Sequence, residues 1–166
     1  MSERKPPYCG MLELRRLTSE ASELEWILEQ EREHFAKGAL TVWLLKPLAA
    51  YQWVYLLEGK GEPLAYLILI SDANDSSNLH LFSLGVSKKW QGQGLGRILM
   101  EKLQTLMQGC GRRILSLTVS PENKRALALY RSTGRIQSQT LQKDYYGKGE
   151  DRLNLVISLQ NFHKSV

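Results

Sequence analysis

A glycine-rich segment past the middle of the chain constrains the fold more than any other feature of the sequence. Residues 91–97 read QGQGLGR; they follow an apolar run at residues 79–86 and open an amphipathic run at residues 98–107. This pattern predicts a strand, a tight turn and a helix in that order. The first N–H groups of a helix have no partner inside the helix, and the helix dipole is positive there. The turn is therefore a predicted phosphate site.

The glycine turn departs from two familiar phosphate-binding motifs. A P-loop ends in Gly-Lys-Ser or Gly-Lys-Thr, whereas Gly96 is followed here by Arg97 and Ile98. A dinucleotide-binding turn follows the first strand and leads to a strand with an acidic tip. This turn lies past the middle of the chain, and residues 114–119 contain no acidic residue. A tight turn that binds no ligand is the alternative that the residues leave open.

The remaining pattern predicts a mixed α/β fold in the order β-α-α-β-β-β-α-β-α-β-β. A first helix is expected from Thr18 onward, and Pro47 is expected to limit a second helix within residues 37–49. Two more helices are expected, one after the glycine turn and one from Pro121 to Gly134. Strands are expected at residues 12–17, 51–57, 63–71, 79–87, 113–120, 136–141 and 153–159.

The last two helices are expected to connect their strands with right-handed crossovers. Strands 79–87 and 113–120 should then run parallel within a partly antiparallel sheet. The glycine turn would lie at the carboxyl edge of that sheet, where open α/β sheets bind their ligands.

The length of the chain predicts a single domain. Its 166 residues suffice for one hydrophobic core, and residues 1–10 are expected to form a flexible leader. No apolar run reaches the length of a membrane span, and the N-terminus lacks the apolar core of a signal peptide, so a cytoplasmic protein without a membrane partner is expected. The two cysteines, Cys9 and Cys110, suggest neither a disulfide nor a metal site, and no metal is expected.

The net charge of +5 is compatible with a polyanionic partner. The basic residues are scattered and are not interleaved with aromatic residues, which argues against a nucleic-acid-binding protein. Many of them flank the glycine turn and the helix that follows the next strand. A positive rim that attracts a polyanionic cofactor is the simpler interpretation.

Three sequence blocks resemble those of the GNAT superfamily of N-acetyltransferases. Gln91, Gly94 and Gly96 match the acetyl-CoA signature Gln/Arg-x-x-Gly-x-Gly/Ala, which follows a strand ending in valine. Residues 123–134 match a second block, Asn-x-x-Ala-x-x-x-Tyr-x-x-x-Gly. Residues 145–151 (YYGKGED) resemble a segment of the branch that acetylates protein N-termini, especially the ribosomal-protein-alanine N-acetyltransferases.

The resemblance covers residues 79–159, whereas residues 1–78 agree only in the order of their elements. It implies acetyl-CoA as the co-substrate, held between two splayed central strands in the manner of an added strand. The backbone of Leu84, Gly85 and Val86 would hold the acetyl and pantetheine groups. The other implied cofactor-binding residues are Gln91, Gly92, Gln93, Gly94, Leu95, Gly96, Arg97 and Asn123. Asn123 is alternatively the N-cap of a helix, and the two roles can coexist.

The resemblance also implies a catalytic role for Tyr130, since a phenol can protonate or hydrogen-bond the thiolate that leaves coenzyme A. The alternative is a buried aromatic residue on a helix face. Thr118 stands where the closest branch carries glutamate, and threonine is no base near neutral pH. His80 is the predicted substitute base, because an imidazole titrates near neutrality. A packed or surface histidine, or a water relay held by Tyr145 and Tyr146, remains an alternative.

We therefore expect an enzyme that transfers an acetyl group from acetyl-CoA to a primary amine by direct attack, as a monomer or a homodimer. The expected acceptor is a protein N-terminal α-amine, including that of a ribosomal protein. An α-amine has a pKa of about 8 and is partly neutral, whereas lysine titrates near ~10.4. A small amine, such as a polyamine or an aminoglycoside-like antibiotic, is one alternative acceptor. A CoA-binding module without turnover is another possible function.

The early helices carry the candidate acceptor-binding residues. Three aromatic side chains either shape an acceptor pocket or pack in the core, namely Trp26, Phe35 and Trp43. Three acidic residues either attract a cationic acceptor or form a solvated helix face, namely Glu29, Glu31 and Glu33.

Overall fold

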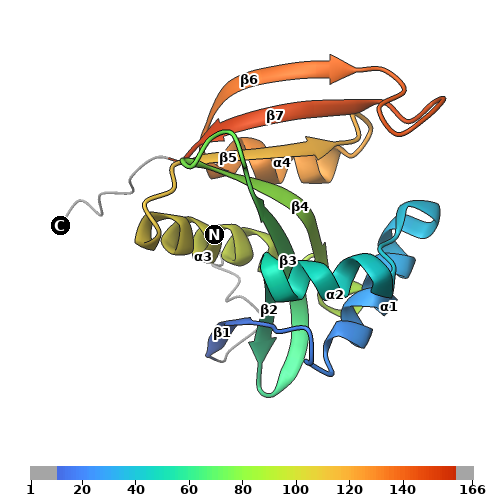
Figure 1. Ribbon diagram of the computed structural model, residues 1–166, viewed down its shortest axis with the longest axis vertical. Helices are drawn as coiled ribbons and strands as arrows, with labels where there is room; N and C mark the ends of the chain where they lie inside the picture. Colours follow the sequence, from blue (N-terminus) through green and yellow to red (C-terminus); the bar gives the residue numbers. More distant parts are fainter. Residues whose placement is uncertain (1–10, 160–166) are drawn as a thin grey trace, which may run out of the picture. The chain divides into compact units, whose positions relative to one another are not determined.

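The computed structural model describes residues 11–159 of the chain, which Figure 1 shows coloured from blue to red along the sequence. These residues divide into two compact units. Of these residues, unit 1 comprises 11–70 and 83–102, and unit 2 comprises 71–82 and 103–159. The three boundaries fall inside two strands and one helix, so each unit holds a part of all three elements. The expected leader at residues 1–10 lies outside the described residues, and the single domain stays a prediction.

Within the described residues, seven strands and four α-helices follow one another in the predicted order. The strands are β1 (Leu12–Arg16), β2 (Trp53–Gly59), β3 (Glu62–Ser71), β4 (Asn78–Val86), β5 (Ile114–Val119), β6 (Arg135–Gln142) and β7 (Arg152–Ser158). The helices are α1 (Leu24–Phe35), α2 (Val42–Tyr51), α3 (Leu95–Gly109) and α4 (Lys124–Thr133), with short 3-10 helices η1 (Ala36–Gly38) and η2 (Lys88–Trp90). The strand order β1-β2-β3-β4-β5-β7-β6 confirms the mixed α/β architecture.

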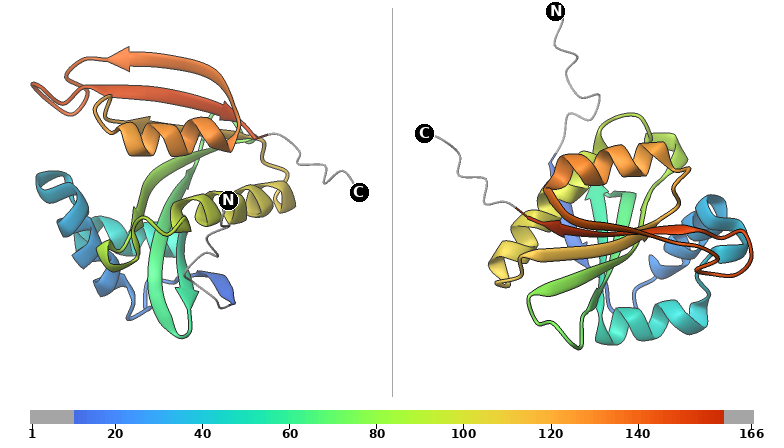
Figure 2. Two further views of the ribbon diagram at one scale, coloured as in Figure 1. Left: turned by 180° about the vertical axis from the view of Figure 1, so that it is seen from behind. Right: turned by 90° about the horizontal axis from the view of Figure 1, so that it is seen from above.

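In unit 1, strands β1, β2 and β3 form an antiparallel meander that packs against α1 and α2 (Figure 2). The turn between β2 and β3 is formed by Lys60 and Gly61, whose φ angles of 53° and 76° are both left-handed. Such angles are typical of a tight hairpin turn. The apolar cluster between helices and strands includes Leu24, Ile27, Leu45, Leu56 and Ile68. Unit 1 therefore has a core of its own.

In unit 2, β5, β7 and β6 are antiparallel neighbours, and the start of β4 pairs with β5 in parallel. The parallel pair confirms the orientation predicted for these two strands. Alternate residues of β5 and β7 are fully buried, namely Leu115, Leu117, Leu155 and Ile157. The residues between them, such as Thr118 and Asn154, are only partly buried. This half of the sheet therefore has one apolar face and one partly exposed polar face.

Helix α1 begins at Leu24, so the predicted start at Thr18 is wrong. Residues 18–22 form turns, including a bond from the Ala21 N–H to the Thr18 carbonyl at 3.1 Å. The Glu23 carboxylate pairs with Arg15 of β1 instead of capping the first turn of the helix. The Arg15–Glu23 ion pair lies directly before the helix, and the local pattern of the sequence does not indicate it.

Helix α2 continues through Pro47, which the sequence predicts to limit the helix. Proline removes one helical N–H, whose partner here would be the carbonyl four residues earlier. The helix nevertheless buries Leu45, Leu48 and Ala49 on one face, and the Gln52 N–H still donates to the Leu48 carbonyl at 2.8 Å. Tertiary packing thus outweighs the lost bond, and β2 begins at Trp53 instead of residue 51.

Candidate active site

The glycine turn of unit 1 has the backbone conformation that only glycine adopts easily. Gly92 and Gly94 have φ angles of 77° and 80°, in the left-handed region. A Cβ atom built on either residue meets no other atom within 4 Å, so both residues face open space. The Gln91 side chain donates to the Val86 carbonyl at 3.0 Å and thereby ties the turn to the end of β4. The turn is fixed by its own chain and is open on its other side.

The predicted phosphate donors lie at the start of α3. This helix begins at Leu95, whose side chain is buried and anchors the turn. The Ile98 N–H donates to the Gly94 carbonyl at 3.1 Å, as the first helical bond. The N–H groups of residues 95–97 precede this bond and have no partner inside the helix. These N–H groups lie at the N-terminal end of the helix, where the helix dipole favours an anion.

Side chains of the turn also suit a polyphosphate. The side-chain amide of Gln93 contains a buried oxygen with no hydrogen-bond partner among the described residues. Arg97 is 80% exposed and pairs with Glu101 at 3.1 Å along the helix. An exposed ion pair of this kind is weak, so the Arg97 guanidinium can leave Glu101 and pair with a phosphate group instead. The open cradle, the helix start and the guanidinium therefore fit the diphosphate of a nucleotide.

The residues predicted to hold the acyl arm occupy the end of β4. Strand β4 pairs with β5 from Asn78 opposite Ile114 to Leu81 opposite Leu117, and the recorded pairing stops there. Leu84, Gly85 and Val86 come after this paired stretch. Gly85 is buried within unit 1, and its neighbours in the strand are half-buried.

Helix α4 of unit 2 carries two of the predicted residues. The Asn123 side chain accepts a hydrogen bond from the Ala126 N–H at 3.1 Å, so this residue caps the helix, as the alternative interpretation expects. Tyr130 is buried, and burial raises the pKa of its hydroxyl to about 12. Tyr130 therefore stays protonated near neutral pH.

His80 lies in a polar cluster where β4 pairs with β5. Its Nδ1 atom lies 3.0 Å from the Ser116 hydroxyl, which also accepts from the Asn78 amide at 3.1 Å. The Asn78 amide donates in turn to Asp72 at 2.9 Å. Burial lowers the pKa of His80, and the nearby Asp72 charge opposes this shift in part. The imidazole is therefore neutral near pH 7 and can accept a proton, as a weaker base than an exposed histidine.

The partly exposed face of unit 2 brings Thr118 and Tyr146 together. Their hydroxyl oxygens lie 3.4 Å apart, and the rings of Tyr145 and Tyr146 meet edge to face at 4.6 Å between centroids. The Arg152 guanidinium lies 5.0 Å from the centroid of the Tyr146 ring. Asn154, opposite Thr118 on β7, has a buried amide oxygen without a described partner. Sequence reasoning missed Arg152 and Asn154, although strand alternation from β7 places both on this face.

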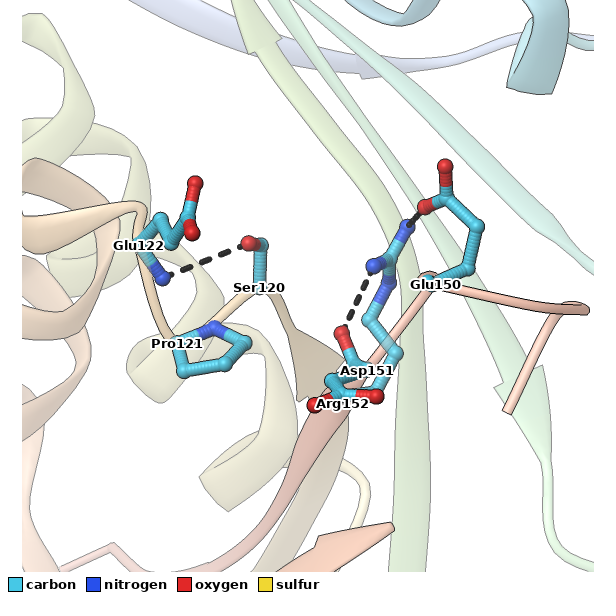
Figure 3. Close-up of a pocket in the computed structure, with 7 residues that line it drawn as sticks. Ser120, Pro121, Glu122, Glu150, Asp151 and Arg152 are labelled. Carbon is cyan, nitrogen blue, oxygen red and sulfur yellow. Dashed lines mark hydrogen bonds and ion pairs between the residues drawn. The ribbon is translucent and has the colours of Figure 1, made fainter. Parts of the chain in front are cut away.

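A polar pocket of about 250 Å³ lies beside this face (Figure 3). It is lined by Ser120, Pro121, Glu122, Gly149, Glu150, Asp151 and Arg152. Glu150 pairs with Arg152 at 3.0 Å, and Asp151 accepts from the Asp144 N–H at 2.9 Å. These contacts hold the loop before β7 in shape and leave the pocket with an excess of negative charge.

The aromatic residues of the early helices have different surroundings. Trp26 is half-buried and packs edge to face against the Tyr66 ring, with 6.2 Å between the ring centroids. It therefore packs against the core. Phe35 and Trp43 are 43% and 87% exposed. Glu29 and Glu33 are exposed, as the solvated-face interpretation expects, whereas Glu31 is buried.

The expectations about membrane spans and cysteines can be compared with the described residues. No helix among them is long and apolar enough to cross a membrane. Cys110 is a free, exposed thiol, and Cys9 lies outside the described range.

The model of the family described as Acetyltransferase (GNAT) family matches residues 11–134. The chain belongs to the GNAT family. Among curated proteins it is 36% identical over 77 residues to the ribosomal protein bS18-alanine N-acetyltransferase of Escherichia coli strain K12, covering 46% of this chain and 51% of that protein. It is 27% identical over 104 residues to the N-terminal acetyltransferase complex ARD1 subunit homolog of Dictyostelium discoideum, covering 62% and 51%. The chain spans about half the length of these curated relatives.

Solved GNAT structures share the fold. The crystal structure of the ribosomal-protein-S18-alanine N-acetyltransferase from Escherichia coli superposes with a TM-score of 0.76 at 24% identity, covering 94% of this chain and 99% of that chain. The structure of yncA from Salmonella typhimurium, solved with its cofactor acetyl-CoA, has a TM-score of 0.71 at 20% identity, covering 92% and 96%. The expected GNAT fold is thereby confirmed.

The lowered pKa of His80 predicts how stability depends on pH. The unfolded state binds the proton at a pKa of about 6.5 and the folded state at a lower pKa, so the free energy of unfolding should fall as the pH drops through about 6.5. His80→Asn should make this fall shallower in urea titrations at a series of pH values. An unchanged slope, together with an NMR titration of His80 at or above pH 6.5, would contradict the described environment.

Proposed function

We propose that this GNAT protein is an enzyme that transfers the acetyl group of acetyl-CoA to the α-amine of a protein N-terminus. The observation that carries the proposal is the glycine turn at the start of α3, in a chain that belongs to an acetyltransferase family. Left-handed glycines and unpartnered helix N–H groups suit the diphosphate of coenzyme A. The relatives named above, which are N-terminal or alanine N-acetyltransferases, support the α-amine as the acceptor.

In this proposal each group of residues has one task toward the donor. The N–H groups of residues 92–97 and the Arg97 guanidinium bind the diphosphate. The backbone of Leu84, Gly85 and Val86 holds the acyl arm by strand-like hydrogen bonds. The Asn123 amide, whose oxygen caps α4, retains its amide N–H₂ for the cofactor. Acetyl-CoA supplies an activated acyl group, and no covalent attachment to the protein is needed.

Tyr130 acts on the leaving group in the proposed reaction. The amine nitrogen forms a bond to the acetyl carbonyl carbon, the carbon–sulfur bond breaks, and its electron pair stays on sulfur. A phenol with a pKa of about 12 is fully protonated at neutral pH and donates a hydrogen bond to the thiolate. Complete proton transfer from this phenol to a thiolate, whose conjugate acid has a pKa of about 8.5, is uphill. Tyr130 therefore stabilises the leaving thiolate mainly by hydrogen bonding.

The proton of the amine needs little help from the protein. An α-amine has a pKa of about 8, so an appreciable fraction is already neutral at physiological pH. Thr118 cannot take the proton as the nucleophile forms its bond. We assign the proton to the neutral His80 imidazole, or to a water molecule held by the hydroxyls of Thr118 and Tyr146. The threonine is also the observation that favours a CoA-binding module without turnover as the second candidate.

Gly94 provides a test of donor binding with an internal control. Gly94 and Gly61 both have positive φ and open space around Cβ, so Gly94→Ala and Gly61→Ala should cost similar folding energy, roughly 1–2 kcal/mol. Calorimetry with coenzyme A should show a Kd that is about tenfold higher or more in Gly94→Ala, which is ~1.4 kcal/mol of binding energy. Gly61→Ala should bind like the wild type. If Gly94→Ala and Gly61→Ala bound coenzyme A with equal affinity, the glycine turn would not be part of the binding site.

Tyr130 provides a test of the chemical step. Tyr130→Phe keeps the ring in the core and removes the hydroxyl, so kcat should fall by about a hundredfold to a thousandfold while the Kd of acetyl-CoA stays the same. The exposed Tyr51 on α2 gives the matched control, since Tyr51→Phe should leave both constants unchanged. Thiol release measured with a saturating amine gives kcat. A normal kcat in Tyr130→Phe would show that Tyr130 only packs in the core and takes no part in the chemical step.

The acceptor class can be tested with matched peptides. Peptides with a free N-terminus and an internal lysine should release thiol from acetyl-CoA, and mass spectrometry should place the acetyl group on the α-amine. The same peptides with a blocked N-terminus should be poor acceptors, because the lysine amine is held protonated. Activity with polyamines or aminoglycosides alone would support the small-amine alternative. Acetyl-CoA binding without thiol release across the whole panel would support the binding module.

A further inference from the structure

Helix α1 contains a buried carboxylate that the proposed chemistry does not use. The side chain of Glu31 is 2% exposed and lies in the core of unit 1. It accepts a hydrogen bond from the Tyr66 hydroxyl at 2.6 Å, another from the Ser83 hydroxyl, and a third from the Leu40 N–H at 3.2 Å. These donors come from β3, from β4 and from the segment that leads into α2. One side chain therefore joins four parts of unit 1.

An apolar residue would be a cheaper occupant of this position. Taking a carboxylate out of water is costly, and its hydrogen bonds at best offset that cost. The neighbouring positions on the buried side of α1, Leu24, Ile27 and Leu28, show that apolar side chains fill this face well. Two of the three donors are hydroxyls that would also be unnecessary in an apolar core. The arrangement favours a specific geometry over maximal stability, as satisfied buried polar networks do.

The geometry that Glu31 fixes is that of strand β4. Ser83 immediately precedes Leu84, Gly85 and Val86, the residues proposed to hold the acyl arm. The Tyr66 ring lies against the same stretch: a Cβ atom on Gly85 would come within 2.4 Å of its Cε1 and 2.7 Å of its hydroxyl oxygen. The strand backbone thus rests directly on a tyrosine whose hydroxyl is held by Glu31.

We propose that Glu31 is a positioning residue that sets the backbone of residues 83–86 for the acyl donor. The inference rests on the proposed function, because it assigns these residues to acetyl-CoA. The carboxylate acts through Ser83 and Tyr66 and does not touch the donor itself. The expected consequence is a selective one: loss of the carboxylate shifts β4 and misaligns the thioester, whereas the diphosphate site at residues 92–97 remains intact.

Glu31→Gln is the primary test, because it keeps the shape and replaces one acceptor oxygen with an N–H₂ group that faces a donor. We expect kcat to fall about tenfold to a hundredfold, as small misplacements of reacting groups do. The Kd of coenzyme A without the acetyl group should change by less than about threefold, because the helix start dominates its binding. Glu25→Gln on the exposed side of the same helix is the matched control and should change neither constant.

Ser83→Ala tests the same claim with a smaller perturbation, in case Glu31→Gln does not fold. It removes one hydroxyl and should lower kcat in the same direction. In the double variant the two losses should add only in part, since the two substitutions share the hydrogen bond between Ser83 and Glu31. A merely structural role would lower the melting temperature and the fraction of active enzyme but leave kcat per active site unchanged. That result would overturn the inference.

The outcomes for the inference and for the proposed function differ. A wild-type protein that binds no coenzyme A, or that releases no thiol with any amine, overturns the proposed function and the inference with it. An active wild type together with normal kcat in both Glu31→Gln and Ser83→Ala overturns the inference alone. A fall in kcat with unchanged Kd, together with an unaffected Glu25→Gln variant, supports it.

Discussion

The unpartnered N–H groups at the start of α3 are the constraint on which the proposed chemistry depends. A helix leaves these donors unsatisfied wherever it begins, but a ligand reaches them only if the preceding backbone stays out of the way. Gly92 and Gly94 meet this condition, because their left-handed angles turn the chain sharply and no side chain fills the space in front of it. Buried Leu95 then fixes the helix end to the core of unit 1. Binding and folding thus use the same few residues.

Strand β4 is the element proposed to position the acyl group, as the glycine turn is proposed to position the diphosphate. It leads directly into the turn, which the Gln91 side chain ties back to the Val86 carbonyl. Gly85 of this strand lies against the Tyr66 ring. The Glu31 carboxylate accepts hydrogen bonds from the hydroxyls of Tyr66 and Ser83. A buried charge is a poor way to gain stability and a good way to specify one arrangement. The hydrogen bonds of Glu31 to Tyr66 and Ser83 therefore fix one arrangement of β4, on which the proposed donor site depends.

The sequence predicts most of the elements and less of the site. Alternation and helical spacing predict the strands and their order, because burial on one face leaves a periodic trace. The start of α1 and the course of α2 through Pro47 were predicted wrongly, since the local pattern indicates neither the Arg15–Glu23 ion pair before α1 nor the tertiary packing of α2. Glu31 was grouped with the exposed acids of its helix. Its spacing of seven residues from Leu24 places it on the buried face, but two of its three donors, Tyr66 and Ser83, lie far away in sequence.

Burial has opposite effects on the two titrating groups that the proposed reaction needs. It raises the pKa of Tyr130 and lowers that of His80, so both groups are uncharged near neutral pH. An uncharged phenol can donate a hydrogen bond to a leaving thiolate, and an uncharged imidazole can accept a proton. Environments that push two pKa values apart define an acid and a base without any strongly charged catalytic residue. In the proposed reaction with an α-amine acceptor, such a pair takes over the proton transfers in a chain that has threonine at position 118.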